Sequence, residues 1–300
     1  MEPFLTRVAS GRTVIGDGAL GTSLMARGLR VQDCLESAVF SRPDLIEEIA
    51  GAYLAAGSEV LTTDTFGASP LKLSSYGLEA RTEEINRRAV ELLRGVAGNR
   101  AWIAGSVGPS SRILTPYGDT ESGEVAASFE RQIGALAEAG ADLIIVETMI
   151  DLAEALLAVA AAKRLAPGLP VVATMTFDAT PRGFFTTMGT TIADAAAGLA
   201  DAGADVIGSN CGNGIEAMVE IGLEFARCTR LPIAIQSNAG LPKLAGGALC
   251  WPETPEHFAE HAAPLVELPV ALLGGCCGTG PDHIRALRRL VDATAGRAAR

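Results

Sequence analysis

The stretch EAGADLIIVETM, residues 138–149, contains a glycine, one acidic residue and then a continuous apolar run. Two other stretches, AAGSEVLTTDTF at 55–66 and DAGADVIGSNCG at 201–212, repeat this order. The glycine suits the left-handed residue that ends a helix, and an apolar run without alternation is typical of a strand buried on both faces. The repeated phrase therefore predicts helix-to-strand joints in a parallel sheet with helical crossovers.

Apolar runs of this kind occur about eight times, with helical patterns between them. The predicted strands are centred near Val14, Val60, Ile103, Ile144, Val172, Val206, Ile233 and Ala271. The helical patterns cover residues 41–57, 79–93, 124–139, 152–165 and 254–266. With no Pro/Ser-rich linker in between, we expect one α/β domain over residues 1–300, a single (β/α)8 TIM barrel. A doubly wound sheet is the alternative, because counting strands does not establish closure.

Composition excludes several classes of protein. The formal net charge of −11 leaves no basic stripe for phosphates, so we expect no nucleic-acid partner. No apolar run approaches the roughly 20 residues that span a bilayer, and the N-terminus lacks a signal-peptide pattern. Six unevenly spaced cysteines in 300 residues do not resemble a secreted disulfide framework. These features predict a cytoplasmic protein without a membrane partner.

Polar and glycine-rich segments follow nearly every predicted strand, at the end where barrel enzymes carry their chemistry. They are GDGALG (16–21), TTDTFGAS (62–69), GSVGP (105–109), VETM (146–149), MTFD (175–178), GSNCGNG (208–214), QSNAG (236–240) and GGCCGTG (274–280). The first also matches a dinucleotide-binding fingerprint, with Glu36 near the place of its ribose-binding acid. Asp17 would face the pyrophosphate there, so we disfavour a nucleotide site.

Three cysteines stand at predicted strand ends. Cys211 ends one strand, and Cys276 and Cys277 end another two strands later. In a closed barrel these ends share one rim, so the three thiols can converge on a single ion. Thiolates select zinc, and three protein ligands leave a fourth position open for substrate.

The other cysteines and the histidines are expected to be structural. We expect Cys34, Cys228 and Cys250 to be small buried hydrophobic residues. His257 and His261 in HFAEH lie one helical turn apart, but the glutamate of an H-E-x-x-H motif is missing. We expect a solvated or half-buried helix face there.

These motifs together resemble the zinc-dependent homocysteine S-methyltransferases, and in particular the homocysteine-binding module of cobalamin-dependent methionine synthase. The resemblance rests on DGALGT, LTTDTFGAS, GSNCGNG, QSNAG and GGCCGTGPDHI and runs from about Gly16 to Leu290. It implies a TIM barrel in which Cys211, Cys276 and Cys277 hold Zn²⁺. The implied reaction transfers a methyl group to the thiol of homocysteine and gives methionine.

The resemblance also implies roles for other matching positions. Glu147 would bind the ammonium group of homocysteine, and Asn238 would offer a side-chain oxygen near the metal. Asp17 would line the pocket and, with these two, belong to the catalytic set. The implied substrate-binding residues are Gly18, Ala19, Asp64 and Thr148.

The sequence departs from the family on the side of the methyl donor. Asp64 stands where the methionine-synthase-like branch commonly has asparagine. Betaine enzymes place aromatic residues around this segment, whereas Asp64 and Gly67 occupy the corresponding positions here, so betaine is disfavoured as the donor. Phe184, Phe185 and Met188 are expected either to meet the donor or to pack as a lid. No D-x-H-x-x-G cobalamin motif occurs, so a corrinoid would come on a separate protein.

Three functions remain open from the sequence. The first is methylation of homocysteine by a small-molecule donor or a separate corrinoid protein. The second is a zinc-dependent demethylase that passes the methyl group of a small compound to a separate corrinoid protein. The third is a thiolate metal-binding or redox-sensing barrel without methyl transfer.

Overall fold

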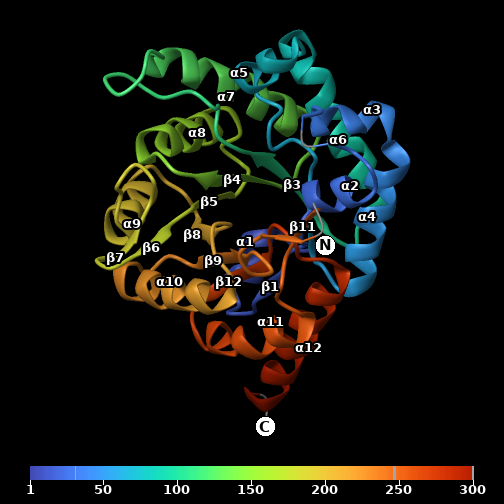
Figure 1. Cartoon of the computed structure of the whole chain (residues 1–300), viewed down its shortest axis with the longest axis vertical. Helices are drawn as coiled ribbons and strands as arrows, with labels where there is room; N and C mark the ends of the chain where they lie inside the picture. The colour runs from blue at the N-terminus through green and yellow to red at the C-terminus, as the bar shows by residue number, and fades with distance from the viewer. Residues whose placement is uncertain (31, 246–247, 299–300) are drawn as a thin grey trace.

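The computed structural model describes residues 1–30, 32–245 and 248–298 (Figure 1). Eight parallel strands form one sheet in the order β1-β12-β9-β8-β5-β4-β3-β2. Their bounds are β1 (Val14–Ile15), β2 (Val60–Thr62), β3 (Trp102–Val107), β4 (Leu143–Met149), β5 (Val171–Met175), β8 (Val206–Asn210), β9 (Ile233–Ser237) and β12 (Val270–Gly275). All eight predicted strands are confirmed.

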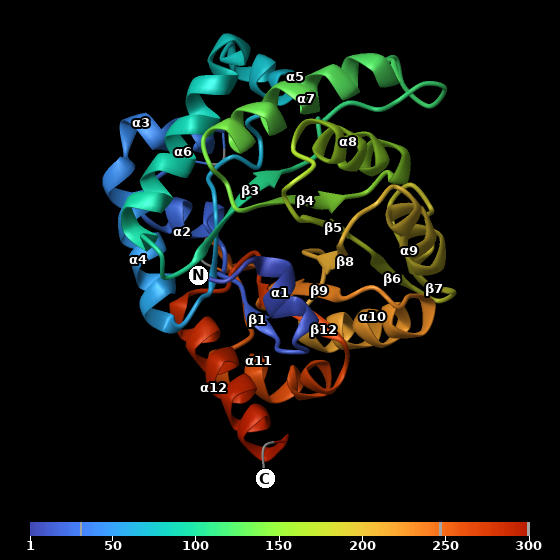
Figure 2. The ribbon, with the colours of Figure 1, turned by 180° about the vertical axis from the view of Figure 1, so that it is seen from behind.

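Helices surround this sheet and connect its strands (Figures 1 and 2). The longer ones are α4 (Pro43–Ala56), α6 (Thr82–Ala97), α7 (Ser122–Glu138), α8 (Leu152–Leu165), α9 (Ile192–Asp201), α10 (Ile215–Cys228), α11 (Pro255–His261) and α12 (Pro281–Ala298). Short α-helices are α1 (Phe4–Ala9), α2 (Gly21–Ala26), α3 (Ala38–Ser41) and α5 (Pro70–Leu73), and 3-10 turns are η1 (Leu35–Ser37), η2 (Ser74–Tyr76), η3 (Glu79–Arg81) and η4 (Ala263–Glu267). Two small hairpins, β6 (Asp178–Thr180) with β7 (Gly183–Phe185) and β10 (Lys243–Ala245) with β11 (Ala248–Cys250), complete the fold.

The seam between β1 and β2 closes the sheet into a barrel. At one end of the seam the backbone N–H of Glu59 donates to the carbonyl of Ile15 at 2.7 Å. At the other end the carboxylate of Asp17 accepts from the N–H of Thr62 at 2.6 Å and from its hydroxyl at 2.9 Å. These bonds replace a strand ladder, so the (β/α)8 barrel is confirmed and the doubly wound alternative is wrong.

The repeated glycine–acid phrase has a structural reason. Its glycines all take the left-handed conformation, with φ of +105°, +88° and +91° at Gly57, Gly140 and Gly203. Its acidic residue in each case accepts a hydrogen bond from a backbone N–H near the start of the neighbouring strand. The three bonds are Ile15 to Glu59 at 3.2 Å, Ile103 to Asp142 at 2.7 Å and Val171 to Asp205 at 2.8 Å. The glycine of this motif therefore ends a helix, and its acidic residue fixes the register of the strand that follows.

The barrel interior is apolar at its N-terminal end. Helix α1 lies across this end (Figure 2), where Phe4 packs edge-on against Trp102 with ring centroids 5.6 Å apart. One apolar cluster joins α1 to residues from all eight strands, among them Leu143 and Ile145 of β4. Their neighbours Ile144 and Val146 belong to the outer core beneath the helices. Because strand side chains alternate between faces, the interior position after Ile145 is Glu147, at the open C-terminal end.

No helix in the part of the chain that the structure describes is both long enough and apolar enough to cross a bilayer. The expectation of no membrane-spanning helix is confirmed to that extent.

Candidate metal centre and active site

Strand β9 brings the cysteines together. Asn210, the last residue of β8, and Gly274 of β12 both align with Gln236 of β9. Just beyond these aligned residues, the N–H of Cys211 donates to the carbonyl of Gln236 at 3.0 Å, and that of Cys276 donates to the carbonyl of Ser237 at 2.7 Å. Both cysteine segments are thus tied to the same end of one strand, on the C-terminal rim of the barrel.

The three thiols meet at the spacing that one ion requires. The Sγ atoms of Cys211 and Cys277 lie 3.9 Å apart, and all three Sγ atoms lie within 4.8 Å of one another. Tetrahedral zinc with Zn–S bonds of about 2.3 Å separates two sulfur ligands by about 3.8 Å. The buried Oδ1 of Asn238 has no hydrogen-bond partner in the described structure, and the Asn238 side chain contacts Cys211. The donor set therefore fits a zinc ion.

Electrostatics within the cluster lead to the same conclusion. Hydrogen bonds from Cys276 and Cys277 lower the pKa of Cys211 to about 3. The same contact with Cys211 raises the pKa of Cys276 well above its ordinary value and that of Cys277 to about 12. Without a cation, the cluster thus favours one thiolate and two thiols. A bound cation would favour the thiolate form of all three cysteines.

Asn210 connects the cysteine cluster to the end of β4. Its Oδ1 accepts from the N–H of Thr148 and the hydroxyl of Thr174, both at 2.7 Å. Its Nδ2 donates to the hydroxyl of Thr148 at 2.7 Å and to Glu147 Oε2 at 3.3 Å. Thr148 and Cys211 have positive φ angles of 60° and 61°, a conformation that costs non-glycine residues about 1–3 kcal/mol. The hydrogen bonds of Asn210 hold the first of these strained turns.

Glu147 is a carboxylate without a cationic partner. Its Oε1 accepts from the hydroxyl of Ser106 at 2.5 Å, and it lines the cavity described below. Burial raises the pKa of Glu147 to about 7, an effect that the hydrogen bond from Ser106 opposes. Among the described residues, no lysine or arginine forms an ion pair with it. A ligand ammonium group would supply the missing positive charge.

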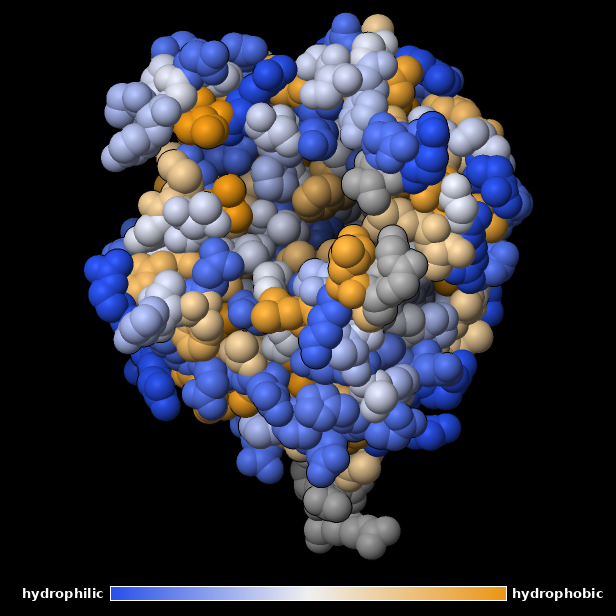
Figure 3. Space-filling model, in the orientation of Figure 1, coloured by the Kyte–Doolittle hydropathy of each residue, from blue (hydrophilic) through white to orange (hydrophobic). Residues whose placement is uncertain are grey.

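A cavity of about 250 Å³ opens beside the thiols. Figure 3 shows the hollow at the centre of the face that Figure 1 presents. Its wall includes four carboxylates, those of Asp17, Glu36, Asp64 and Glu147, together with the three cysteines and the apolar side chains of Met25, Leu35 and Phe66. Such a wall favours a ligand with both positive charge and apolar surface.

Asp64 is the carboxylate on this wall whose bonding is incomplete. It is 6% exposed, and its Oδ2 has no hydrogen-bond partner among the described atoms. Burial, and then the charge of Glu36, raise the pKa of Asp64 well above its ordinary value. Glu36 is held in place because its Oε1 accepts from the N–H of Gly67 at 2.7 Å. A cation bound between Glu36 and Asp64 would lower the cost of burying both charges.

Most sequence-predicted site residues come together at this cavity. Its wall contains Asp17, Gly18, Ala19, Asp64, Glu147, Thr148, Cys211, Cys276 and Cys277. Asn238 contacts Cys211 but is not among the described residues that line the cavity. The burial of Cys34 is confirmed, whereas the expected burial of Cys228 and Cys250 is wrong because both are exposed.

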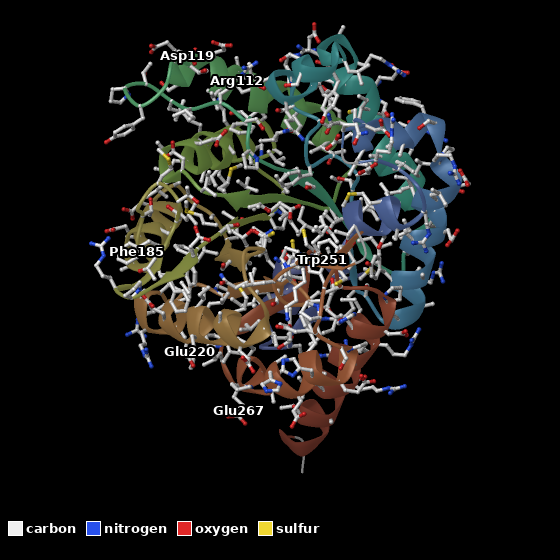
Figure 4. The ribbon with its side chains drawn as sticks, viewed as in Figure 1. Arg112, Asp119, Phe185, Glu220, Trp251 and Glu267 are labelled. Carbon is white, nitrogen blue, oxygen red and sulfur yellow. The ribbon has the colours of Figure 1, made fainter. Side chains whose placement is uncertain are left out.

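The hairpin residues are not on the cavity wall either. Phe185 lies at the periphery (Figure 4), where Arg182 stacks over its ring at 5.3 Å. Phe184 packs against the outer core, and Met188 is exposed. None of the three is among the described residues that line the cavity. The structure therefore does not place them in contact with a donor bound in the cavity.

Sequence reasoning gave no site role to four residues that the structure places at the cavity or beside the cysteines: Asn210, Glu36, Phe66 and Trp251. Trp251 lies near the centre of the view in Figure 4 and packs on Gly278, where a Cβ atom would lie 2.0 Å from its ring. Gly278 has a φ of +81°, so a glycine is required beside Cys277 both for conformation and for space. A signal existed for Asn210, which is polar and ends a buried apolar strand directly before Cys211.

Gly18→Ala should distort the floor of the cavity. A Cβ atom at Gly18 would lie 2.8 Å from Thr279 Oγ1 and 2.9 Å from the buried ring of Tyr53. We expect this overpacking to lower the free energy of unfolding by about 1–3 kcal/mol in chemical denaturation. The control is Gly134→Ala in α7, where a Cβ atom meets nothing within 4 Å and should stabilise by about 0.4–1 kcal/mol. Equal stability of the two variants would contradict the proposed contact between Gly18 and Tyr53.

Comparison with known proteins agrees with this geometry. The sequence pattern of the homocysteine S-methyltransferase family matches residues 14–291. Methionine synthases of Mycobacterium tuberculosis and Mycobacterium leprae are 33% and 32% identical over 94% and 99% of the chain, which spans about a quarter of their length (25% and 26%). The metallated homocysteine methyltransferase MmuM of Escherichia coli is 26% identical, with a TM-score of 0.76 over 92% of this chain and 96% of that one. The chain belongs to the homocysteine S-methyltransferase family.

Proposed function

We propose that the protein is a zinc-dependent methyltransferase that converts homocysteine to methionine. The observation that carries this proposal is the convergence of three thiols, at zinc-ligand spacing, on the wall of a cavity that also contains the unpaired carboxylate of Glu147. The alternative of a metal-binding or redox-sensing barrel does not account for this cavity. Thiols of this kind stay reduced in the cytoplasm, which is the location we propose.

Cys211, Cys276 and Cys277 would hold the zinc ion, and Asn238, whose side chain contacts Cys211 and whose Oδ1 has no partner among the described atoms, would be a further ligand in the absence of substrate. A bound zinc ion would lower the pKa of the homocysteine thiol, so that this thiol reacts as a thiolate near neutral pH. No general base is then required. In the transfer, a sulfur lone pair of homocysteine forms the new S–CH₃ bond, and the donor leaves with the electrons of the broken bond.

Glu147 would orient homocysteine. Its carboxylate lies at the end of β4 and is fixed from both sides by Ser106 and Asn210. An ammonium group bound there would place the amino-acid end of homocysteine between β3 and β8, with the thiol directed to the cysteines. Positioning of this kind supplies much of the rate enhancement in bimolecular transfers.

The donor is proposed to be a small cation. Asp64 and Glu36 supply negative charge on the cavity wall, and Phe66 adds an aromatic side chain that is 39% exposed. A sulfonium or ammonium compound satisfies both features. The second candidate is a methylated corrinoid on a separate protein, which would have to cover the C-terminal rim. Demethylation of a small compound toward such a protein would use the same site in reverse.

Removal of any one of the three cysteines should remove the metal. We expect about one zinc ion per chain at this site in the purified protein and clear loss in Cys211→Ala, Cys276→Ala and Cys277→Ala, by elemental analysis after dialysis against a mild chelator. The exposed Cys228 and Cys250 serve as matched controls, and their alanine variants should keep the wild-type content. Full retention of zinc in all three site variants would reject the site.

Glu147→Gln should weaken homocysteine binding and leave the zinc content unchanged. A lost charge-assisted hydrogen bond costs about 1.5–3 kcal/mol, or roughly ten- to a hundred-fold in affinity, measured by calorimetry on the zinc-loaded protein. Glu138→Gln, the same change at an exposed helix end, is the control. Wild-type affinity in the Glu147 variant would assign this residue a structural role.

Methyl transfer by the isolated protein distinguishes the donors. We expect methionine to form, as detected by mass spectrometry, from homocysteine and a cationic donor such as S-methylmethionine. Asp64→Asn should raise the KM of this donor more than that of homocysteine, whereas Asp119→Asn on the exposed periphery (Figure 4) should change neither. Turnover with methylcobalamin alone, indifferent to Asp64→Asn, would favour a corrinoid protein as the donor.

A further inference from the structure

A second group of metal-ligating side chains lies outside the cavity, on the surface where α10 and α11 pack together. Glu216 comes from the first turn of α10, and His257 and His261 lie one turn apart on α11. Glu216 Oε1 is 3.4 Å from His261 Nε2 and 4.0 Å from His257 Nε2. One ligand atom from each of the three side chains falls within 4.8 Å of the others.

We propose that Glu216, His257 and His261 form a second metal site, which takes a borderline transition-metal ion of the zinc class. Zinc ligands bound through nitrogen and oxygen at about 2.0–2.1 Å lie about 3.3 Å apart in a tetrahedral arrangement. The 3.4 Å separation already matches this value, and the 4.0 Å separation closes with a small rotation of an exposed side chain. Two imidazoles and one carboxylate suit zinc, copper or nickel, whereas magnesium and calcium prefer oxygen ligands alone.

The hydrogen bond of His261 Nδ1 orients this ring for metal binding. Its Nδ1 lies 2.8 Å from the backbone carbonyl of His257. A carbonyl oxygen only accepts, so Nδ1 carries a proton, and in the neutral tautomer that this bond selects the lone pair is on Nε2. That nitrogen is the one that faces Glu216. Histidines that bind metals commonly donate their other ring N–H to a carbonyl in this way, which fixes both tautomer and ring orientation.

The alternative, a salt bridge from Glu216 to protonated histidines, fits the geometry less well. The rings of His257 and His261 are 4.0 Å apart between centroids and tilted by 32°. At this distance two imidazolium charges repel each other. A single divalent cation held by both rings and by Glu216 avoids this repulsion.

The backbone around this cluster is well fixed. Glu253 Oε2 accepts from the N–H of Ile215 at 3.2 Å, which ties the start of α11 to the start of α10. The hydroxyl of Thr254 accepts from the N–H of His257 at 3.3 Å and caps α11, whose Phe258 is fully buried. The three ligand side chains themselves are 37%, 38% and 68% exposed, so water can complete the coordination. A metal here would clamp α10, which begins shortly after Cys211, to α11.

Titration of the zinc-loaded protein with further Zn²⁺ tests the proposal. Calorimetry should show a second equivalent that binds more weakly than the thiolate-bound metal. Imidazole resonances of His257 and His261 should shift with this equivalent in NMR spectra of the wild-type protein, whereas those of His283 should not. These spectra need no variant and therefore do not depend on whether a substitution folds.

Variants with a matched control complete the test. Glu216→Gln and His261→Gln should each weaken the second binding event at least ten-fold and leave the thiolate zinc in place. Glu220→Gln makes the same change one turn along α10 (Figure 4) on an exposed side chain and should bind as wild type does. Absence of a second equivalent, unshifted His257 and His261 resonances, or equal losses in the Glu216 and Glu220 variants would overturn the proposal.

Discussion

The pairing of β9 with both β8 and β12 is the constraint on which the site depends. Each neighbour lies in parallel register with β9, so that Asn210 and Gly274 stand at the same height on either side of Gln236. Cys211, one residue after Asn210, and Cys276, two residues after Gly274, then donate backbone hydrogen bonds to the end of β9. A shift of one residue in either pairing would turn a cysteine away from the others, because strand side chains alternate between faces. Convergence of the thiols is thus a consequence of register.

A deficit of positive charge runs through the whole cavity. Glu147 and Asp64 have raised pKa values because burial disfavours their charged forms, and the cysteines limit one another's ionisation. The described residues of the wall include carboxylates and thiols but no lysine or arginine. In the proposed function each group binds one cation: the thiols a metal ion, Glu147 an ammonium group, and Asp64 with Glu36 the methyl donor. The negative charge of the cavity wall would then be neutralised by the bound ligands.

Sequence patterns predicted the parts of this structure that depend on local order. The helix-to-strand phrase predicted the barrel because its glycine and acid act within one joint and on the adjacent strand. Cys211, Cys276 and Cys277 were predicted because strand ends share a rim in any closed barrel. Asn210 and Glu36 were missed because their roles come from partners far along the chain, Glu147 and Gly67. Cys228 and Cys250 were wrongly expected to be buried, since a short or amphipathic element does not reveal which face a lone cysteine takes.

Zinc K-edge X-ray absorption of the metal-loaded protein, with and without homocysteine, tests the central claim most directly. The claim is that three cysteine sulfurs hold the ion and that the homocysteine sulfur takes the remaining position. The expected result is three sulfur ligands and one oxygen or nitrogen ligand at rest, and four sulfur ligands after homocysteine is added. A sulfur count that stays at three when homocysteine saturates the protein would contradict the account.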